Sequence, residues 1–372
     1  MYAHRTRIRA DFLLVLIVIF ATACGGGGGS RTPPPPVSNN VEWLIPIGNV
    51  FDGGPGKDGI PALQSPDFES AATILTVGSN ELAIAVKHGA TVKIYPHDIM
   101  DWHEIVNDGP ANDPYVLSYC PLTGSAMAWL ATPTDADSSF GVSGLLYNSN
   151  LLLYDRQTDS IWSQMLEISI SGFRIRELPE RIQLLEGRYG TLRDMYPNAL
   201  VMTRNTGFNR NYQNYPYGDY RENASLLFPV TSVDQRLHPK TRVIGIRSGS
   251  GIDADTVTKA YQLNGFGSTT LAINDQFQDQ SIVVVGNTAL DFAVIYDREL
   301  ADGTILTFTA IDNDLPNILS DDEGNVWDAF GTAVTGPRAG EQLSITRSYT
   351  AYWFAWVAHF PDTEIHFNLV GS

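Results

Sequence analysis

The chain has 372 residues, of which 43% are hydrophobic and 17% are charged, and its formal net charge is −17. This ordinary globular composition excludes disorder along most of the chain. The acidic balance excludes nucleic acid as a partner, because binding to a phosphate backbone needs clustered Lys and Arg. The 33 Gly, 21 Pro and 16 Tyr residues favour many short strands and turns. The sequence therefore predicts a mainly β, β-rich α+β fold with a few short helices.

The first 23 residues have the pattern of a lipoprotein signal peptide. Three arginines precede an unbroken apolar run at 12–21, and small residues lead to Cys24. The run is shorter than the roughly 20 residues that a membrane-spanning helix needs. We expect removal of 1–23 and acylation of Cys24, with a cleaved soluble form as the alternative. Lipid on Cys24 predicts a membrane-anchored protein of the cell envelope that faces the periplasm, and Gly25 favours the outer over the inner membrane.

The rest of the chain divides into a tether and two similar copies. Residues 24–40 are rich in Gly and Pro and read as the tether. Copies of a β-rich unit are expected at 41–203 and 226–372, joined by a connector at 204–225 that is rich in Tyr and Asn. Three landmark pairs support the duplication, with offsets of 164 to 166 residues: Tyr95 and Tyr261, Trp162 and Trp327, Pro197 and Pro361. At an offset of 165 the residue matching Cys120 is Val285, so the second copy lacks the cysteine.

Local patterns place the first copy's elements. Strand-like runs at 81–86 and 91–95 flank a turn that contains Gly89. Apolar residues at spacings of three and four predict a helix over 97–106, and a second helix at 190–196 is ended by Pro197.

Cys120, in the stretch Cys-Pro-Leu-Thr-Gly, is the candidate nucleophile. It follows a strand-like run and precedes a turn, where backbone N–H groups and the Thr123 hydroxyl favour the thiolate and a pKa below about 8.5. His103 is the candidate base, with Asn107 or Asp108 orienting its imidazole. The alternatives are a buried cysteine that packs as a small hydrophobe and a histidine that only bonds a loop carbonyl. With Cys24 lipidated, no disulfide within the mature fold is expected.

Other chemistries have weaker support in the sequence. Cys120 with His97, Asp98 and His103 is a conceivable copper or zinc site, but the spacing matches no established ligand pattern. Acidic runs at 135–138 and 321–325 lack the final Glu of a calcium loop and predict turns. There is no Gly-rich phosphate loop and no nucleophile elbow, so no cofactor and no metal is expected.

A second hypothesis is a non-enzymatic binding or scaffolding lipoprotein in which Cys120 only packs. Its partner-binding surface is then the connector, which holds four tyrosines. Under either hypothesis the expected partners are the membrane, through Cys24, and another envelope protein or a thiol protein. Trp162 and Trp327 recur in both copies and are expected in the core.

Several motifs together resemble the bacterial domain of unknown function 3179 family. They are DGIPAL at 58–63, HEIVND at 103–108, YCPLTGSA at 119–126, the run from Phe140 to Gln164 that ends in WSQ, PYGDY at 216–220, and YWFAW and PDTEI near the end. The resemblance implies an exported or envelope-bound protein of unestablished activity. Some relatives carry selenocysteine at the position of Cys120, which implies redox or nucleophilic chemistry there. One departure is Glu167, where the family resemblance leads us to expect Gly and its access to positive φ.

Overall fold

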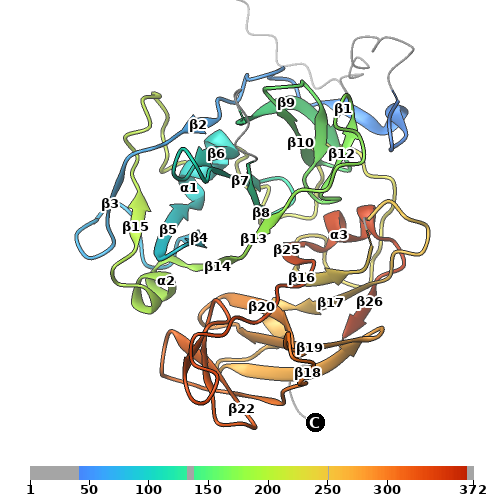
Figure 1. Ribbon diagram of the computed structural model, residues 1–372. Coiled ribbons are helices and arrows are strands. Elements are labelled where there is room, and N and C mark those ends of the chain that lie inside the picture. Colours follow the sequence, from blue (N-terminus) through green and yellow to red (C-terminus); the bar gives the residue numbers. More distant parts are fainter. Residues whose placement is uncertain (1–41, 132–137, 250, 367–372) are drawn as a thin grey trace, which may run out of the picture. The chain divides into compact units, whose positions relative to one another are not determined.

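A computed structural model describes residues 42–131, 138–249 and 251–366 (Figure 1). The predicted signal peptide, the tether with Cys24 and residues 135–137 lie outside this part. The fold is mainly β, as predicted. Its helices are α1 (His97–His103), α2 (Tyr189–Met195) and α3 (Trp353–His359), with two 3-10 turns, η1 (Ile47–Asn49) and η2 (Leu263–Gly265).

The first half of the chain forms three five-stranded sheets. One sheet has the strand order β14-β4-β5-β15-β3. Its strands are β3 (Phe68–Ser70), β4 (Leu82–His88), β5 (Thr91–Pro96), β14 (Leu184–Arg188) and β15 (Leu200–Met202). The order β13-β8-β7-β6-β2 uses β2 (Leu63–Gln64), β6 (Ile105–Asp108), β7 (Tyr115–Cys120), β8 (Ser125–Leu130) and β13 (Arg181–Ile182). The order β1-β9-β10-β11-β12 uses β1 (Val50–Asp52), β9 (Phe140–Tyr147), β10 (Asn150–Asp155), β11 (Ile161–Ser163) and β12 (Ile168–Ser171).

The second half forms three smaller sheets. One sheet has the strand order β25-β16-β17-β26. Its strands are β16 (Arg242–Arg247), β17 (Thr258–Gln262), β25 (Ser348–Tyr352) and β26 (Glu364–His366). The order β18-β19-β20 uses β18 (Leu271–Phe277), β19 (Gln280–Asn287) and β20 (Phe292–Asp297). The order β21-β22-β23-β24 uses β21 (Phe308–Ala310), β22 (Asn317–Asp321), β23 (Val326–Asp328) and β24 (Ala333–Thr335).

Strands pair in the same order in the two halves. The β4–β5 hairpin corresponds to β16–β17, and β6-β7-β8 corresponds to β18-β19-β20. In each half a later strand pairs with the hairpin, a helix follows, and the next strand runs parallel to the second hairpin strand. Even side-chain bonds recur: Tyr95 donates to Asp108 at 2.6 Å, and Tyr261 donates to Asp275 at 2.6 Å. A common origin of the halves by duplication stays a prediction, and this topology is what the duplication would produce.

The two halves share their hydrophobic cores. One cluster of buried residues contains Cys120 and Trp162 together with Trp356 and Ile365. A second cluster likewise draws on both halves. Strand β14 contacts β20, and its counterpart β25 contacts β8, the counterpart of β20. The halves therefore pack as one body rather than as two separate domains.

The predicted helix over 97–106 is too long by three residues. Helix α1 ends at His103, because Glu104 takes φ 58° and ψ −32° and turns the chain into β6. The helix predicted before Pro197 is present as α2, and the turn at Gly89 joins β4 to β5. A positive φ at a non-glycine residue has no sequence signature, so the early end of α1 was not predictable.

Strand register also corrects the match between Cys120 and Val285. Asn107 pairs with Val116 in the first half, and Asn274 pairs with Val283 in the second. Counting along the equivalent strands β7 and β19 places Cys120 opposite Ser125 in one hairpin and Asn287 opposite Phe292 in the other. The residue equivalent to Cys120 is therefore the buried Asn287, an offset of 167 rather than 165.

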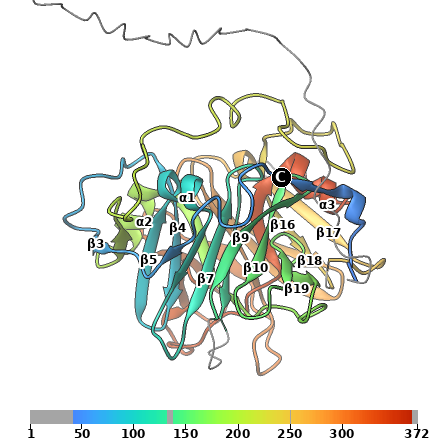
Figure 2. The same cartoon turned by 90° about the horizontal axis from the view of Figure 1, so that it is seen from above.

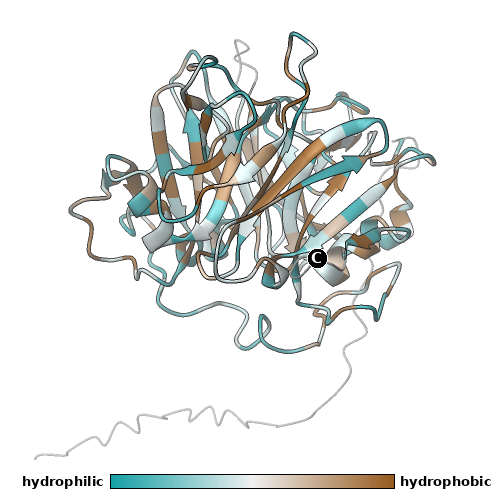
Figure 3. Cartoon of the chain, turned by 90° about the horizontal axis from the view of Figure 1, so that it is seen from below, coloured by the Kyte–Doolittle hydropathy of each residue, from teal (hydrophilic) through white to brown (hydrophobic). Residues whose placement is uncertain are grey.

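Brown, apolar colour is concentrated on the strands, and the connecting loops are mostly teal (Figure 3). The predicted connector, 204–225, has no helix or strand. It crosses the side of the sheets on which α1 and α3 lie (Figure 2). This course brings it over the end of β7, where Cys120 lies.

Candidate functional site

Cys120 ends strand β7 and is fully buried. The turn that follows is closed by hydrogen bonds from the N–H groups of Thr123 and Gly124 to the Cys120 carbonyl, at 3.2 and 2.8 Å. Gly124 has φ +59°, and a Cβ there would lie 2.9 Å from the ring of Tyr352. A glycine is thus required both by the backbone conformation and by the close packing of Tyr352. The Sγ atom lies 3.8 Å from the carbonyl oxygen of Ser149, a weak thiol hydrogen bond.

The connector covers this turn with three tyrosines. Tyr215 donates to the carbonyl of Pro121 at 3.2 Å, and Tyr220 donates to the carbonyl of Leu122 at 3.0 Å. Tyr217 donates to a carboxylate oxygen of Glu104 at 3.5 Å. The tyrosine-rich segment that the sequence suggested as a partner surface is therefore engaged within the chain, directly over the cysteine.

Glu104 is the buried carboxyl group of the site. It lies at the end of α1 with 4% of its surface exposed. Burial raises the pKa of Glu104 to about 8, against the opposing effect of the Tyr217 hydroxyl. At neutral pH this carboxyl group is therefore mostly protonated, and the site carries no full negative charge there.

The thiol is held in its neutral form. Burial, and after it the charge that Glu104 carries above about pH 8, raises the pKa of Cys120 to about 11, although a hydrogen bond with Thr123 acts in the opposite direction. The expected pKa below about 8.5 is thus wrong for this conformation, because the turn is enclosed and the ionisable groups that interact with the thiol are a carboxyl group and tyrosines, not a cation. The neighbours are nevertheless polar, so Cys120 does not lie in a purely apolar core.

A second acid, Asp101, ties the connector to α1. Arg221 of the connector bonds Asp101, and it stacks 3.9 Å from the ring centroid of Tyr215. Burial raises the pKa of Asp101 to about 7, while the charge of Arg221 lowers it. The connector is thus fastened over Cys120 by one ion pair and three tyrosine hydroxyls.

A buried hydrogen-bond network joins separate motifs beneath the turn. The Thr123 and Ser125 hydroxyls lie 2.8 Å apart, and Ser125 donates to Gln164 of the WSQ motif at 2.8 Å. Asn150 donates to Gln164 at 2.7 Å and to Thr123 at 3.0 Å. The network fixes the turn from below, because each buried polar group has a partner.

The structure does not bring His103 to Cys120. One ring nitrogen lies 2.8 Å from the carbonyl oxygen of Pro61, and the other lies 2.7 Å from the hydroxyl of Tyr212. Within the described part of the chain no hydrogen bond joins His103 to the thiol. The imidazole bonds a loop carbonyl, which is the alternative considered from the sequence.

Asn107 and Asp108 do not orient His103 either. The Asn107 side chain exchanges two hydrogen bonds with the backbone of Phe140, at 2.8 and 2.9 Å. Asp108 accepts bonds from Lys93 at 2.7 Å and from Tyr95 at 2.6 Å. The same contacts recur around Asn274 and Asp275 in the second half, which is typical of structural roles.

Glu167 occupies the position at which the family resemblance predicts glycine. It keeps the positive φ, 52°, that a glycine would take there. Its fully buried side chain lies 2.8 Å from Arg247 and 2.8 Å from Arg181. Two ion pairs with buried Glu167 therefore offset the strain of this loop conformation.

Sequence reasoning missed Glu104, Tyr217 and Arg221 as members of the site. Glu104 adjoins His103 in HEIVND, and Tyr217 belongs to PYGDY, so motif membership was the available signal. No group of three His, Cys, Asp or Glu side chains suited to a metal ion occurs among the described residues.

Comparison with known proteins identifies a family but no activity. A family model described as "Protein of unknown function (DUF3179)" matches residues 57–363. This match covers most of the chain, including every element that builds the site around Cys120. No curated protein and no solved structure matches the chain. The chain therefore belongs to the DUF3179 family of proteins of unknown function.

Proposed function

We propose that this protein is a lipid-anchored protein of the cell envelope in which Cys120 acts as a nucleophile at a site covered by the connector. The observation that carries the proposal is the enclosure of a thiol and the Glu104 carboxyl group beneath three tyrosine hydroxyls. Cys120 packs in a hydrophobic cluster, but its sulfur also lies 3.8 Å from the Ser149 carbonyl oxygen and interacts with the Thr123 hydroxyl and the Glu104 charge, which a purely apolar site would not supply.

The chemistry starts with a proton transfer. With the connector displaced, water reaches both groups, and the desolvation that raises their pKa values is relieved. As the sulfur bonds to the electrophilic atom of a substrate with its S–H electron pair, the Glu104 carboxylate takes the thiol proton and the leaving group of that atom departs with its electrons. Covered, the thiol stays protonated and inert. The connector in this proposal therefore controls reactivity by controlling access of water.

The envelope location rests on the N-terminal sequence pattern. Basic residues, a short apolar run and a cysteine after small residues support lipidation at Cys24. In the described residues, no helix is long and apolar enough to cross a membrane. One or more acyl chains on Cys24 would then supply the anchorage.

The test compares how the thiol and the whole fold are protected. The mature chain carrying Cys24→Ala has one thiol, and its alkylation by iodoacetamide is followed across a series of low urea concentrations. If the connector opens locally, alkylation proceeds with a protection free energy well below that of global unfolding and with little urea dependence. Protection equal to global unfolding overturns the proposal and favours a packing role in a scaffold protein.

A matched pair of connector variants sharpens this test. Tyr217→Phe removes a hydroxyl that bonds Glu104, whereas Tyr212→Phe removes one that bonds His103 away from the thiol. We expect only Tyr217→Phe to raise the alkylation rate, by about two- to fivefold, since one long hydrogen bond contributes about 0.5 to 1 kcal/mol. Equal effects of the two variants count against gating at Cys120.

A further inference from the structure

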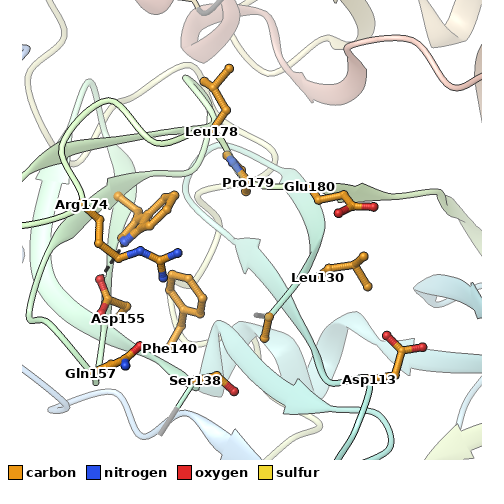
Figure 4. A pocket seen from close by; sticks show the side chains of 12 residues that line it. Asp113, Leu130, Ser138, Phe140, Asp155, Gln157, Arg174, Leu178, Pro179 and Glu180 are labelled. Carbon is orange, nitrogen blue, oxygen red and sulfur yellow. Dashed lines mark hydrogen bonds between the residues drawn. The ribbon is translucent and has the colours of Figure 1, made fainter. Parts of the chain in front are cut away.

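A pocket of about 310 Å³ lies at the other end of strand β8 from the cysteine (Figure 4). Ser125 at the start of β8 pairs with Cys120, whereas Leu130 at its end lines the pocket. Six residues of strand separate the two ends, about 17 Å. The pocket is therefore distinct from the site around Cys120, and its volume lies in the range of small-molecule sites.

One guanidinium group points into this pocket. Arg174 lies 5.2 Å from the ring centroid of Trp162, and its Nε bonds Glu177 at 2.6 Å. Among the described residues, no hydrogen bond uses the two terminal nitrogens of Arg174. The stacking and the Nε bond hold the group in place, so a fork of N–H donors faces the pocket ready for a carboxylate.

Two carboxylates lie across the pocket from Arg174. Figure 4 shows Asp113 and Glu180 on the opposite side, with the side chain of Leu130 near them. The Asp113 side chain is 54% exposed and lies 2.8 Å from His88, which neutralises it only when the imidazole is protonated. In the described part of the chain, no hydrogen bond uses the Glu180 side chain. The far side is thus suited to a cation.

The third carboxylate, Asp155, is already engaged and does not count toward a ligand. It accepts bonds from the Trp162 indole at 3.0 Å and from the backbone N–H of Thr158 at 2.7 Å. Between the charged ends, Leu130, Ala131 and Pro179 form an apolar wall. The pocket is therefore charged at both ends, with opposite signs, and apolar in the middle.

We propose that this pocket binds an amino acid with a basic side chain, either free or at the C-terminus of a peptide. The α-carboxylate would bond the Arg174 fork, the methylene groups would lie on the apolar wall, and the side-chain cation would face Asp113 and Glu180. The order of charges in the pocket matches the order of the α-carboxylate and the side-chain cation in lysine or arginine, with the α-nitrogen beside the carboxylate.

Other ligand classes fit these observations less well. A sugar needs an open aromatic face, but Trp162 and Phe140 are only 2% and 5% exposed. A phosphate dianion would meet one guanidinium and an excess of carboxylates. A divalent cation would meet the guanidinium of Arg174, which repels it.

The test is calorimetric titration of the mature protein with three ligands of matched length. Lysine carries both ends, norleucine lacks the side-chain cation and cadaverine lacks the carboxylate. We expect lysine to bind at least about tenfold more tightly than either, since each charged contact contributes about one power of ten. Equal affinities for the three ligands, or no heat with about 10 mM lysine, overturn the proposal.

Substitutions at each end of the pocket test which residues bind the ligand's carboxylate and which bind its side-chain cation. Arg174→Gln should remove the preference for lysine over cadaverine, and Glu180→Gln should reduce the preference for lysine over norleucine. Arg176→Gln is the matched control, because Arg176 lies on the same loop and its side chain is 64% exposed in an ion pair with Glu42. A loss of lysine binding in Arg176→Gln as large as in Arg174→Gln refutes the assignment of the carboxylate end.

Discussion

Replacing Glu167 by glycine tests whether its buried ion pairs stabilise the loop that carries it. The substitution Glu167→Gly relieves a positive φ of 52° at a non-glycine residue, which is worth about 1 kcal/mol. It also removes the partner of Arg247, whose side chain is fully buried at 2.8 Å from the carboxylate. Leaving a buried charge without its partner costs about 3 to 5 kcal/mol. We therefore expect Glu167→Gly to lower the free energy of unfolding by about 2 to 4 kcal/mol.

Urea unfolding followed by tryptophan fluorescence measures this difference, with Asp58→Gly as the matched control. Asp58 also has a positive φ, 56°, and also bonds an arginine, Arg156, but its side chain is 38% exposed. An exposed pair contributes about 1 kcal/mol or less, so the two effects of Asp58→Gly nearly cancel. If Glu167→Gly is as stable as the unaltered protein, the buried ion pair does not hold the loop, and the reasoning is wrong.

Two further expectations come from the structure and a third from the N-terminal sequence. Burial raises the pKa of Glu104 to about 8, so its protonated form stabilises the fold at low pH, and this stabilisation is lost as the pH rises from the ordinary value of about 4.3 toward 8. Urea unfolding measures how far the free energy of unfolding falls between about pH 5 and about pH 9. This fall should be smaller for Glu104→Gln than for the unaltered protein, by up to about 1.4 kcal/mol per pH unit. Equal falls in the two proteins contradict the raised pKa of Glu104. Cys120→Ser keeps a donor near a carbonyl and should cost about 1 kcal/mol, whereas Val285→Ser buries a hydroxyl in an apolar core and should cost about 2 to 3 kcal/mol; similar losses in denaturant unfolding would make Cys120 a packing residue. Cys24→Ala should leave the protein unprocessed or soluble in membrane fractionation, and retention after a high-salt wash would show that the apolar run at 12–21 is the anchor.

The motifs read from the sequence come together in space, but with different partners from those expected. Thr123 and Gln164, from separate motifs, meet in one buried network beneath the turn at Cys120. The sequence favours His103 because it lies near the cysteine strand and because imidazole is the commonest base. The chain instead turns at Glu104, whose charge acts on the thiol, while the imidazole lies against the Pro61 carbonyl.

The alignment of the two halves also could not be read from the sequence alone. The landmark residues give offsets of 164 to 166, yet strand register gives 167 for Cys120 and Asn287. Loops of unequal length change the offset between landmarks, and a shift of two residues leaves the alternation of a strand unchanged. Only the paired partners, Ser125 and Phe292, define the equivalent position.

The sequence by itself determined the mainly β class, the hairpin turns at Gly89 and at 321–325, the end of α2 before Pro197 and the family, because these depend on local conformational preference and on the residues of short motifs. Only the tertiary structure decided that the connector lies over Cys120, that Glu104 adjoins it and that the thiol is protonated. Burial and electrostatics are sums over neighbours that come from distant parts of the chain, and Tyr215 and Tyr220 reach the turn from almost a hundred residues away.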